Sequence, residues 1–132
     1  MSLYQDSVDV EDLSALVRVE VIPRPAGFNA ANPPQGTLYA DASKLLFPLC
    51  FRRWKEGDCF RPFGMKNFKK LSDFFNDEGL DLEQKRRQII VTTNSHDGKE
   101  QIVCIANRRL DDRFRVTETT ESVAVIIQNR KD

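Results

Sequence analysis

The sequence predicts an α+β fold, a small and mostly antiparallel β-barrel of about six to seven strands with two short helices inserted. Two observations lead to this prediction. Short segments rich in Val, Ile, Phe and Thr recur along the chain and are separated by Pro, Gly, Asn and Asp, which is typical of strands and turns. The only stretch with helical spacing of apolar residues lies between the third and fourth of these segments. The expected strands cover residues 16–22, 37–40, 49–54, 89–93, 101–106, 114–117 and 123–127.

The first part of the chain shows how turn residues set the ends of these strands. Residues 16–22 alternate apolar and charged side chains, which predicts a half-buried strand. Pro23 and Pro25 end it, and residues 26–36, with their Asn, Pro and Gly, form a loop. The second strand follows this loop, and Asp41 then caps a brief helical turn.

Two short helices are expected in the middle of the chain. The first begins at Asn67 and ends at Gly79, which are suitable capping residues. The second opens with a capping box, in which Asp81 is followed three residues later by Gln84, and it continues through Arg87. The apolar face of the first helix consists of Phe68, Leu71, Phe74 and Phe75.

Length and composition indicate one domain. The chain has 132 residues, 40% of them hydrophobic and 30% charged, and its net charge is zero, which is ordinary for a globular protein. We expect the domain to cover residues 15–132 and the acidic residues 1–14 to be a connector or residues added for expression. No apolar run approaches the ~20 residues that cross a bilayer. Three cysteines in no recognisable framework fit the reducing cytoplasm.

The sequence contains no pattern of catalytic or metal-binding residues. It lacks the glycine-rich phosphate loops of nucleotide-binding enzymes. The single histidine, His96, lies beside Asp97-Gly98, the predicted turn of a hairpin between the fourth and fifth strands. We therefore expect no catalytic residue and no metal site, and an independent enzyme would need a cleft with a strongly perturbed titrating group. The cysteines that lack zinc-ligand spacing are Cys50, Cys59 and Cys104.

One segment concentrates basic and aromatic residues. Residues 52–75 hold the only Trp and five of the nine Phe, and residues 52–70 carry seven basic residues against Glu56 and Asp58. Because the whole chain is neutral, this local excess of positive charge predicts a face for a polyanion. The candidate contact residues are Lys66, Lys69, Lys70, Arg52, Arg53, Arg61 and Trp54.

The three lysines of this segment suggest how a phosphate would bind. Lys69 and Lys70 fall in the first turn of the expected helix, where backbone N–H groups already favour anions, and Lys66 lies just before it. The alternative is that these lysines are simply solvated. Trp54 could stack on a base or a ribose if it is exposed.

Four blocks of this sequence resemble the C-terminal domain of bacterial tRNA(Ile)-lysidine synthetases. The resemblance is strongest over residues 37–127, and the departures are Cys59, where Arg is common, and Asn67, where Gly is usual. It implies a small β-barrel with helices, related to a domain in the β-subunit of phenylalanyl-tRNA synthetase. The blocks are RWKEGD at 53–58, RPFGMK at 61–66, KKLSDF at 69–74 and DRFRVT at 112–117.

The resemblance also implies a function. The full enzymes of that family are ATP-dependent ligases that join lysine to the wobble cytidine of an isoleucine tRNA. Their catalytic domain carries a Ser-Gly-Gly-x-Asp-Ser loop that this sequence lacks, so ATP and Mg would belong to a missing N-terminal domain and no cofactor to this one. The expected partners are the acceptor stem of tRNA, the catalytic domain and a second copy of the chain. The alternative function is a protein-docking or dimerisation domain without direct RNA contact.

Overall fold

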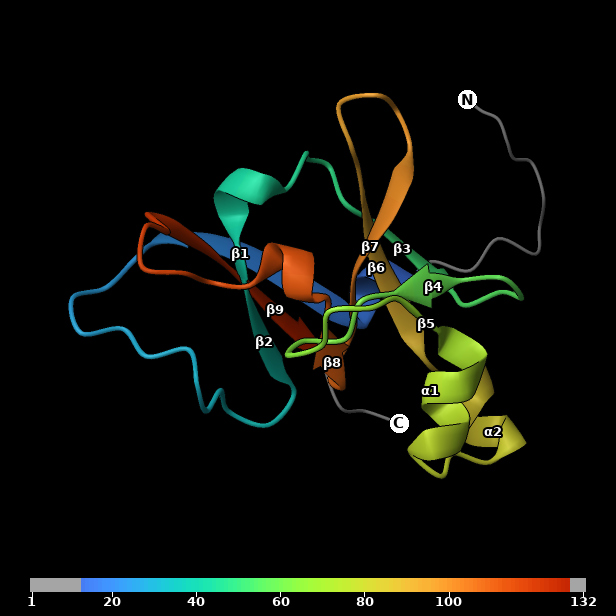
Figure 1. Cartoon of the computed structure of the whole chain (residues 1–132). Coiled ribbons are helices and arrows are strands. Elements are labelled where there is room, and N and C mark those ends of the chain that lie inside the picture. Colours follow the sequence, from blue (N-terminus) through green and yellow to red (C-terminus); the bar gives the residue numbers. More distant parts are fainter. Residues whose placement is uncertain (1–12, 129–132) are drawn as a thin grey trace.

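The computed structural model describes residues 13–128, which form three antiparallel sheets and two short helices (Figure 1). The first sheet has the order β1-β9-β2, with β9 in the centre. Its strands are β1 (Val17–Pro23), β9 (Ser122–Gln128) and β2 (Thr37–Asp41). The expected connector, residues 1–14, lies largely outside the described residues, although Leu13 is buried in the core.

The second sheet has the order β3-β6-β7-β8, and a third, two-stranded sheet pairs β4 with β5. The second sheet consists of β3 (Cys50–Arg53), β6 (Ile89–Asn94), β7 (Glu100–Ile105) and β8 (Arg109–Leu110). The two strands of the third sheet are β4 (Cys59–Phe60) and β5 (Lys69–Lys70). The helices are α1 (Leu71–Asp77) and α2 (Leu82–Arg86), which lie together at the end of the molecule away from the first sheet (Figure 1).

The central hairpin β6–β7 separates two hydrophobic cores. Ile89 and Val91 of β6 pack into the first core, which the β1-β9-β2 sheet covers, whereas Ile90 packs into the second core with α1. Because both faces of β6 are covered, it has a continuous apolar run instead of the alternation of a half-exposed strand. The second core consists of Phe60, Leu71, Phe74, Phe75, Ile90, Ile102 and Ile105.

The structure confirms the small mixed fold with mostly antiparallel sheets and two helices. The closed barrel is not confirmed, because the strand pairings within residues 13–128 leave three separate sheets. Six of the seven expected strands are present, and the strand expected at residues 114–117 is wrong. There the carboxylate of Asp111 accepts a hydrogen bond from the Arg113 N–H at 2.8 Å and caps a 3-10 turn, Asp112–Phe114.

The expected start of the first helix is also wrong. Lys69 and Lys70 pair with β4 as a short strand, and the Leu71 N–H donates to the Asp58 carbonyl at 2.9 Å, so α1 begins only at Leu71. Phe68 therefore lies before the helix and is 56% exposed instead of facing the core. Lys69 and Lys70 therefore do not occupy a first helical turn, and Lys70 is the residue that directly precedes α1.

The other helix ends agree with the sequence. Asp81 and Gln84 form the predicted capping box at α2. Gly79 follows α1 with a φ of +77°, its N–H donates to the Asn76 carbonyl at 3.0 Å, and the Leu80 N–H donates to the Phe75 carbonyl at 3.1 Å. This pair of bonds is a Schellman motif.

Candidate nucleic-acid interface

The most distinctive feature of the basic segment is a turn held against the end of β8. We call residues 61–66 the clasped turn. Its Phe63 N–H donates to the Leu110 carbonyl at 2.9 Å, and its Arg61 carbonyl accepts from the Asp112 N–H at 2.7 Å. Within the turn, the Met65 N–H donates to the Pro62 carbonyl at 2.8 Å.

The first carboxylate that fixes this turn is Asp111, which is 0% exposed. It accepts the Arg61 N–H at 2.8 Å, and the Arg113 side chain donates to it from Nε at 2.9 Å and from a terminal nitrogen at 3.0 Å. A buried carboxylate is stable only when its oxygens are paired in this way. Asp111 thus joins the turn to the 3-10 turn that follows β8.

The second carboxylate is Asp112. It accepts the Gly64 N–H at 3.0 Å and ion pairs with Arg61 and Arg115, each at 3.1 Å. The Gly64 hydrogen bond, with smaller contributions from Arg61 and Arg115, lowers the pKa of Asp112 against the opposing effect of burial. Gly64 has a φ of +89°, a conformation that favours glycine. The clasp therefore depends on RPFG at 61–64 and on the two aspartates together.

The clasped turn presents unpaired groups to solvent. Phe63 is 51% exposed and Met65 43% exposed, and the Lys66 side chain has no ion pair or hydrogen bond within residues 13–128. Next to the turn, the guanidinium of Arg113 lies 4.9 Å from the ring centre of exposed Phe68. Exposed rings beside cations are what proteins use to stack on nucleotides and hold phosphates.

Several candidate contact residues are instead engaged inside the protein. Arg52 pairs with Asp58 at 2.9 Å and with Glu100 at 3.0 Å, and the Asp58 contact above all raises its pKa further. Arg61 is held by the clasp, as described above. Arg53 donates to the Arg87 carbonyl at 2.8 Å. Trp54 is half-buried, with its ring edge-on to Phe75 at 5.3 Å.

The three candidate lysines differ from one another. Lys69 forms an ion pair with Asp77 of α1. Lys66 and Lys70 are exposed, and no carboxylate within the described chain pairs with either. Acidic residues from outside the segment thus neutralise part of its apparent positive charge, and the structure leaves these two lysines available.

The residues that sequence reasoning missed are Asp111, Asp112 and Arg113. The two aspartates are buried and bind backbone N–H groups of a turn about 50 residues away. Nothing in the spacing indicates this long-range pairing. The two segments also meet in an isolated β-bridge between Pro62 and Asp111.

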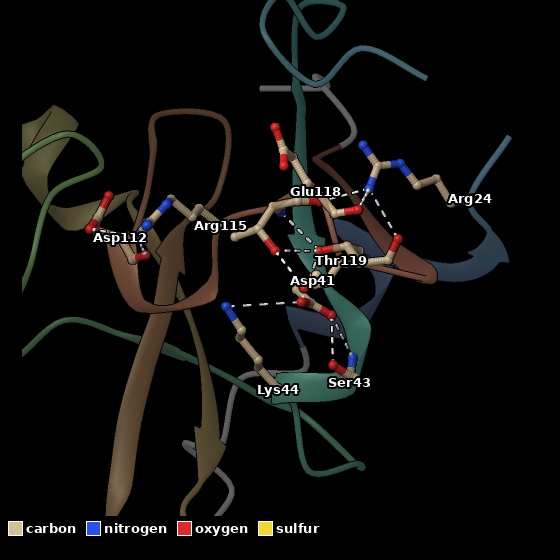
Figure 2. Close-up of polar contacts among 10 residues, drawn as sticks. Arg24, Asp41, Ser43, Lys44, Asp112, Arg115, Glu118 and Thr119 are labelled. Atoms are coloured by element: carbon tan, nitrogen blue, oxygen red, sulfur yellow. Dashed lines mark hydrogen bonds and ion pairs between the residues drawn. The ribbon is translucent and has the colours of Figure 1, made fainter. Parts of the chain in front are cut away.

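A third aspartate, Asp41, fixes the loop at residues 117–120, which precedes β9 (Figure 2). Asp41 is buried and accepts the Thr120 hydroxyl at 2.9 Å and the Ser43 hydroxyl at 2.8 Å. Burial raises the pKa of Asp41, but these hydrogen bonds outweigh it, and the net effect is a lowered pKa. Arg24 reaches the same loop and donates to the carbonyls of Thr117 at 2.7 Å and Thr120 at 3.1 Å.

The described residues contain no group of three His, Cys, Asp or Glu side chains placed to hold a metal ion. His96 is exposed at the tip of the β6–β7 hairpin, as expected. Burial raises the pKa of the Cys104 thiol, while Cys50 and Cys59 are exposed and free. Within residues 13–128, no helix has the length and apolar character needed to cross a membrane.

Comparison with known proteins finds relatives of one kind. The chain is 43% identical over 88 residues to the tRNA(Ile)-lysidine synthase of Parabacteroides distasonis, covering 67% of this chain and 19% of that protein. It is 39% identical over 85 residues to the enzyme of the same name from Bacteroides thetaiotaomicron, covering 64% and 19%. The chain thus spans about a fifth of the length of these relatives. No family model matches it.

Two solved structures share its fold. The crystal structure of the TILS C-terminal domain aligns with a TM-score of 0.67 at 16% identity, over 88% of this chain and 85% of that one. An N-terminal fragment of the phenylalanyl-tRNA synthetase β-subunit from Pyrococcus horikoshii aligns with a TM-score of 0.57 at 17% identity, over 72% of this chain and 28% of that one. The resemblance expected from the four sequence blocks is confirmed: this chain is similar in sequence to tRNA(Ile)-lysidine synthases and has the fold of their C-terminal domain.

Proposed function

We propose that this chain is the tRNA-binding, substrate-recognition domain of a tRNA(Ile)-lysidine synthase that acts in the cytoplasm. The observation that carries the proposal is the clasped turn. It holds RPFGMK at 61–66, one of the four segments that resemble the synthetase family, with its lysine and phenylalanine side chains exposed to solvent. Joining lysine to the wobble cytidine, with ATP and Mg, is assigned to a catalytic domain elsewhere in the full-length enzyme. This domain grips the acceptor stem and so positions the substrate.

Exposed lysines without a carboxylate partner are the preferred contact residues in this proposal. Lys66 and Lys70 are the primary phosphate contacts, because both are exposed and neither is paired with a carboxylate within residues 13–128. Lys69 can reach RNA only by leaving Asp77. An A-form stem presents phosphates and 2′-hydroxyls more readily than base edges, so a few lysines on a rigid turn suit it.

Candidate residues that are engaged in the fold take a positioning role in this proposal. Arg52 and Arg61 hold the segment through Asp58 and Asp112, and Trp54 packs against Phe75. Arg53, on the edge strand β3, remains a secondary contact. Replacing any of these four would disturb the fold and the RNA contact together, so they are poor probes of binding.

The test is the salt dependence of tRNA binding by a Lys66→Gln/Lys70→Gln variant. Each lost phosphate contact should reduce the slope of log Kd against log salt by ~0.7–0.9, so the double variant should bind more weakly at low salt and with a flatter slope. A Lys44→Gln/Lys99→Gln variant has the same change in charge outside the basic segment and should retain the wild-type slope. Equal slopes for all three proteins would rule out Lys66 and Lys70 as contacts.

The exposed side chains of Phe63, Met65 and Phe68 favour one rival, docking onto the catalytic domain or a second copy. Sedimentation of the chain with and without tRNA separates the two. A complex with tRNA supports recognition. A stable dimer that is indifferent to tRNA supports docking.

A further inference from the structure

The structure contains a groove that the gripping function above does not use. It lies between the loop that joins β1 to β2, strand β8 and the loop that precedes β9, and its volume is about 690 Å³. Pockets of roughly 300–1,000 Å³ are typical of small-ligand sites. Its wall includes three aromatic and three basic side chains: Phe28, Tyr39, Phe63, Arg24, Arg108 and Arg109.

The aromatic side chains come from two separate parts of the chain. Phe28 and Tyr39 form an edge-to-face pair with ring centres 4.9 Å apart, which fixes the β1–β2 loop against β2. Phe63 comes from the clasped turn and is half exposed. A flat ligand that entered the groove would meet π surfaces on both sides.

The basic side chains differ in how much of their charge is already matched. Arg109 lies with its guanidinium 5.4 Å from the ring centre of Phe74, and no carboxylate in the described chain pairs with it. Arg108 donates to Gln88 at 3.0 Å and lies 3.7 Å from Glu78. Within residues 13–128, Arg24 binds backbone carbonyls and no carboxylate, as Figure 2 shows for its contacts with the 117–120 loop.

Among the residues that line the groove, the carboxylate is Glu118. Because Glu78 outside the groove matches Arg108, the groove has Arg24 and Arg109 against Glu118. The groove is therefore aromatic and carries an excess of positive charge. These are the two properties that single-strand binders combine, in which a ring stacks on a base and a cation holds the adjacent phosphate. An unpaired nucleotide matches both properties, because its base can stack on the rings and its phosphate can pair with the guanidinium groups.

We infer that the groove binds an unpaired nucleotide adjoining the RNA stem held by the clasped turn. This inference rests on the proposed function, because the same RNA must reach both places. Phe63 belongs to the clasped turn and to the groove wall, so a strand leaving the phosphates near Lys66 can enter the groove directly. Bases within a duplex are covered by their neighbours, so only a base that has left the stack can lie against Phe63 or Phe28.

Three RNA hairpins with the same stem test the inference: one with a short single-stranded 3′ overhang, one with an abasic overhang of equal length, and one with a blunt end. Wild-type protein should bind the first hairpin roughly fivefold or more tighter than the abasic one for each stacked base. Arg109→Gln should bind the overhang and blunt hairpins nearly equally. Arg18→Gln, on the exposed face of β1, is the matched control and should keep the wild-type preference.

The outcomes separate this inference from the proposed function. If wild-type protein bound all three hairpins with equal affinity, the inference that the groove binds a nucleotide would be overturned. A salt slope that depends on Lys66 and Lys70 would in that case still support the proposed binding of the RNA stem. The groove inference would also be overturned if wild-type protein bound the overhang and abasic hairpins equally well and both more weakly than the blunt hairpin. No binding of any hairpin or of tRNA would overturn both. The abasic comparison uses wild-type protein, so it does not depend on the folding of a variant.

Discussion

Two loops of this domain are each fixed by buried aspartates, but the aspartates have different partners. Asp112 holds the clasped turn through one backbone N–H and two guanidinium groups. Asp41 holds the loop at residues 117–120 through the Thr120 hydroxyl, and it also accepts the hydroxyl and the backbone N–H of Ser43 in its own turn. Its cationic partner within residues 13–128, Lys44, is 3.9 Å away. Because Arg61 and Arg115 are paired with Asp112, less unpaired positive charge remains around the clasped turn than the sequence indicates.

The comparison teaches that a carboxylate can position a binding surface without touching the ligand. Around the clasped turn, Arg61 and Arg115 are used to fix backbone geometry, and the exposed Lys66 is left for a partner. Around residues 117–120, Arg24 donates to carbonyls instead. Both aspartates should therefore stabilise the fold, but only the clasp should control RNA binding through the grip.

The largest effect is expected for Asp111→Ala, which removes the carboxylate shared by Arg61 and Arg113. Two backbone N–H groups and a guanidinium would lose a buried partner, and we expect the free energy of unfolding to fall by about 3 kcal/mol or more. Urea denaturation measures it. Glu121→Ala, at an exposed position just before β9, is the control and should leave the midpoint nearly unchanged. A shift below about 1 kcal/mol for Asp111→Ala would contradict the clasp.

A smaller decrease in the free energy of unfolding, about 1–3 kcal/mol, is expected for Asp112→Asn and for Asp41→Asn. Both carboxyls have lowered pKa values, so their stabilisation is fully present above the unfolded pKa of about 4 and is lost as pH falls through the folded pKa. Each variant should therefore lose less stability than wild type between about pH 5 and pH 3. Urea midpoints across this range measure it.

RNA binding distinguishes these two variants. Asp112→Asn loosens the turn that carries Lys66 and should weaken binding of a blunt hairpin, whereas Asp41→Asn should not. Added salt should also reduce the stability difference of Asp112→Asn more, because its partners are charged. Equal effects of both substitutions on hairpin binding would contradict the assigned role of the clasp.

The smallest effects are expected when the exposed cationic partners are replaced. Arg115→Gln removes one of the two guanidinium partners of Asp112. Because the Arg115 side chain is 47% exposed, the free energy of unfolding should fall by roughly 0.2–1 kcal/mol. Lys44→Gln removes a longer contact and should have no larger effect. Thermal unfolding at low and high salt would show both. A larger loss of stability for Lys44→Gln than for Arg115→Gln would contradict the difference between the partners of Asp41 and Asp112.

The sequence predicted the features of the fold that depend on local patterns. The strands around β1, β6 and β7, the capping box at Asp81 and the glycine after α1 all depend on neighbouring residues, and they are confirmed. The helix start at Asn67 failed because β4 pairs with Lys69 and Lys70, a contact that local pattern does not contain. The strand at residues 114–117 failed because Asp111 caps a tight turn there.

The site was predicted only in part, and for the same reason. Composition singled out the basic segment, and the choice of Lys66 and Lys70 as phosphate contacts stays a prediction. The pairing of Arg52 with Glu100 and of Arg61 with Asp112 could not be predicted, because each pair is separated by about 50 residues in the sequence. Local charge counts overestimate a basic face whenever the fold brings carboxylates from another strand. Likewise, the groove joins Phe28 and Phe63 through tertiary structure alone.

The β6–β7 hairpin has a consequence for how the domain opens. It forms a wall of both hydrophobic cores, so neither core can be exposed to water while the other keeps its full set of contacts. The three-stranded sheet and the helical end should therefore melt as one cooperative unit, with no half-folded form that keeps one core intact. A surface that has to hold RNA at a fixed distance from a catalytic centre benefits from this, because its grip cannot loosen separately from the body that carries it.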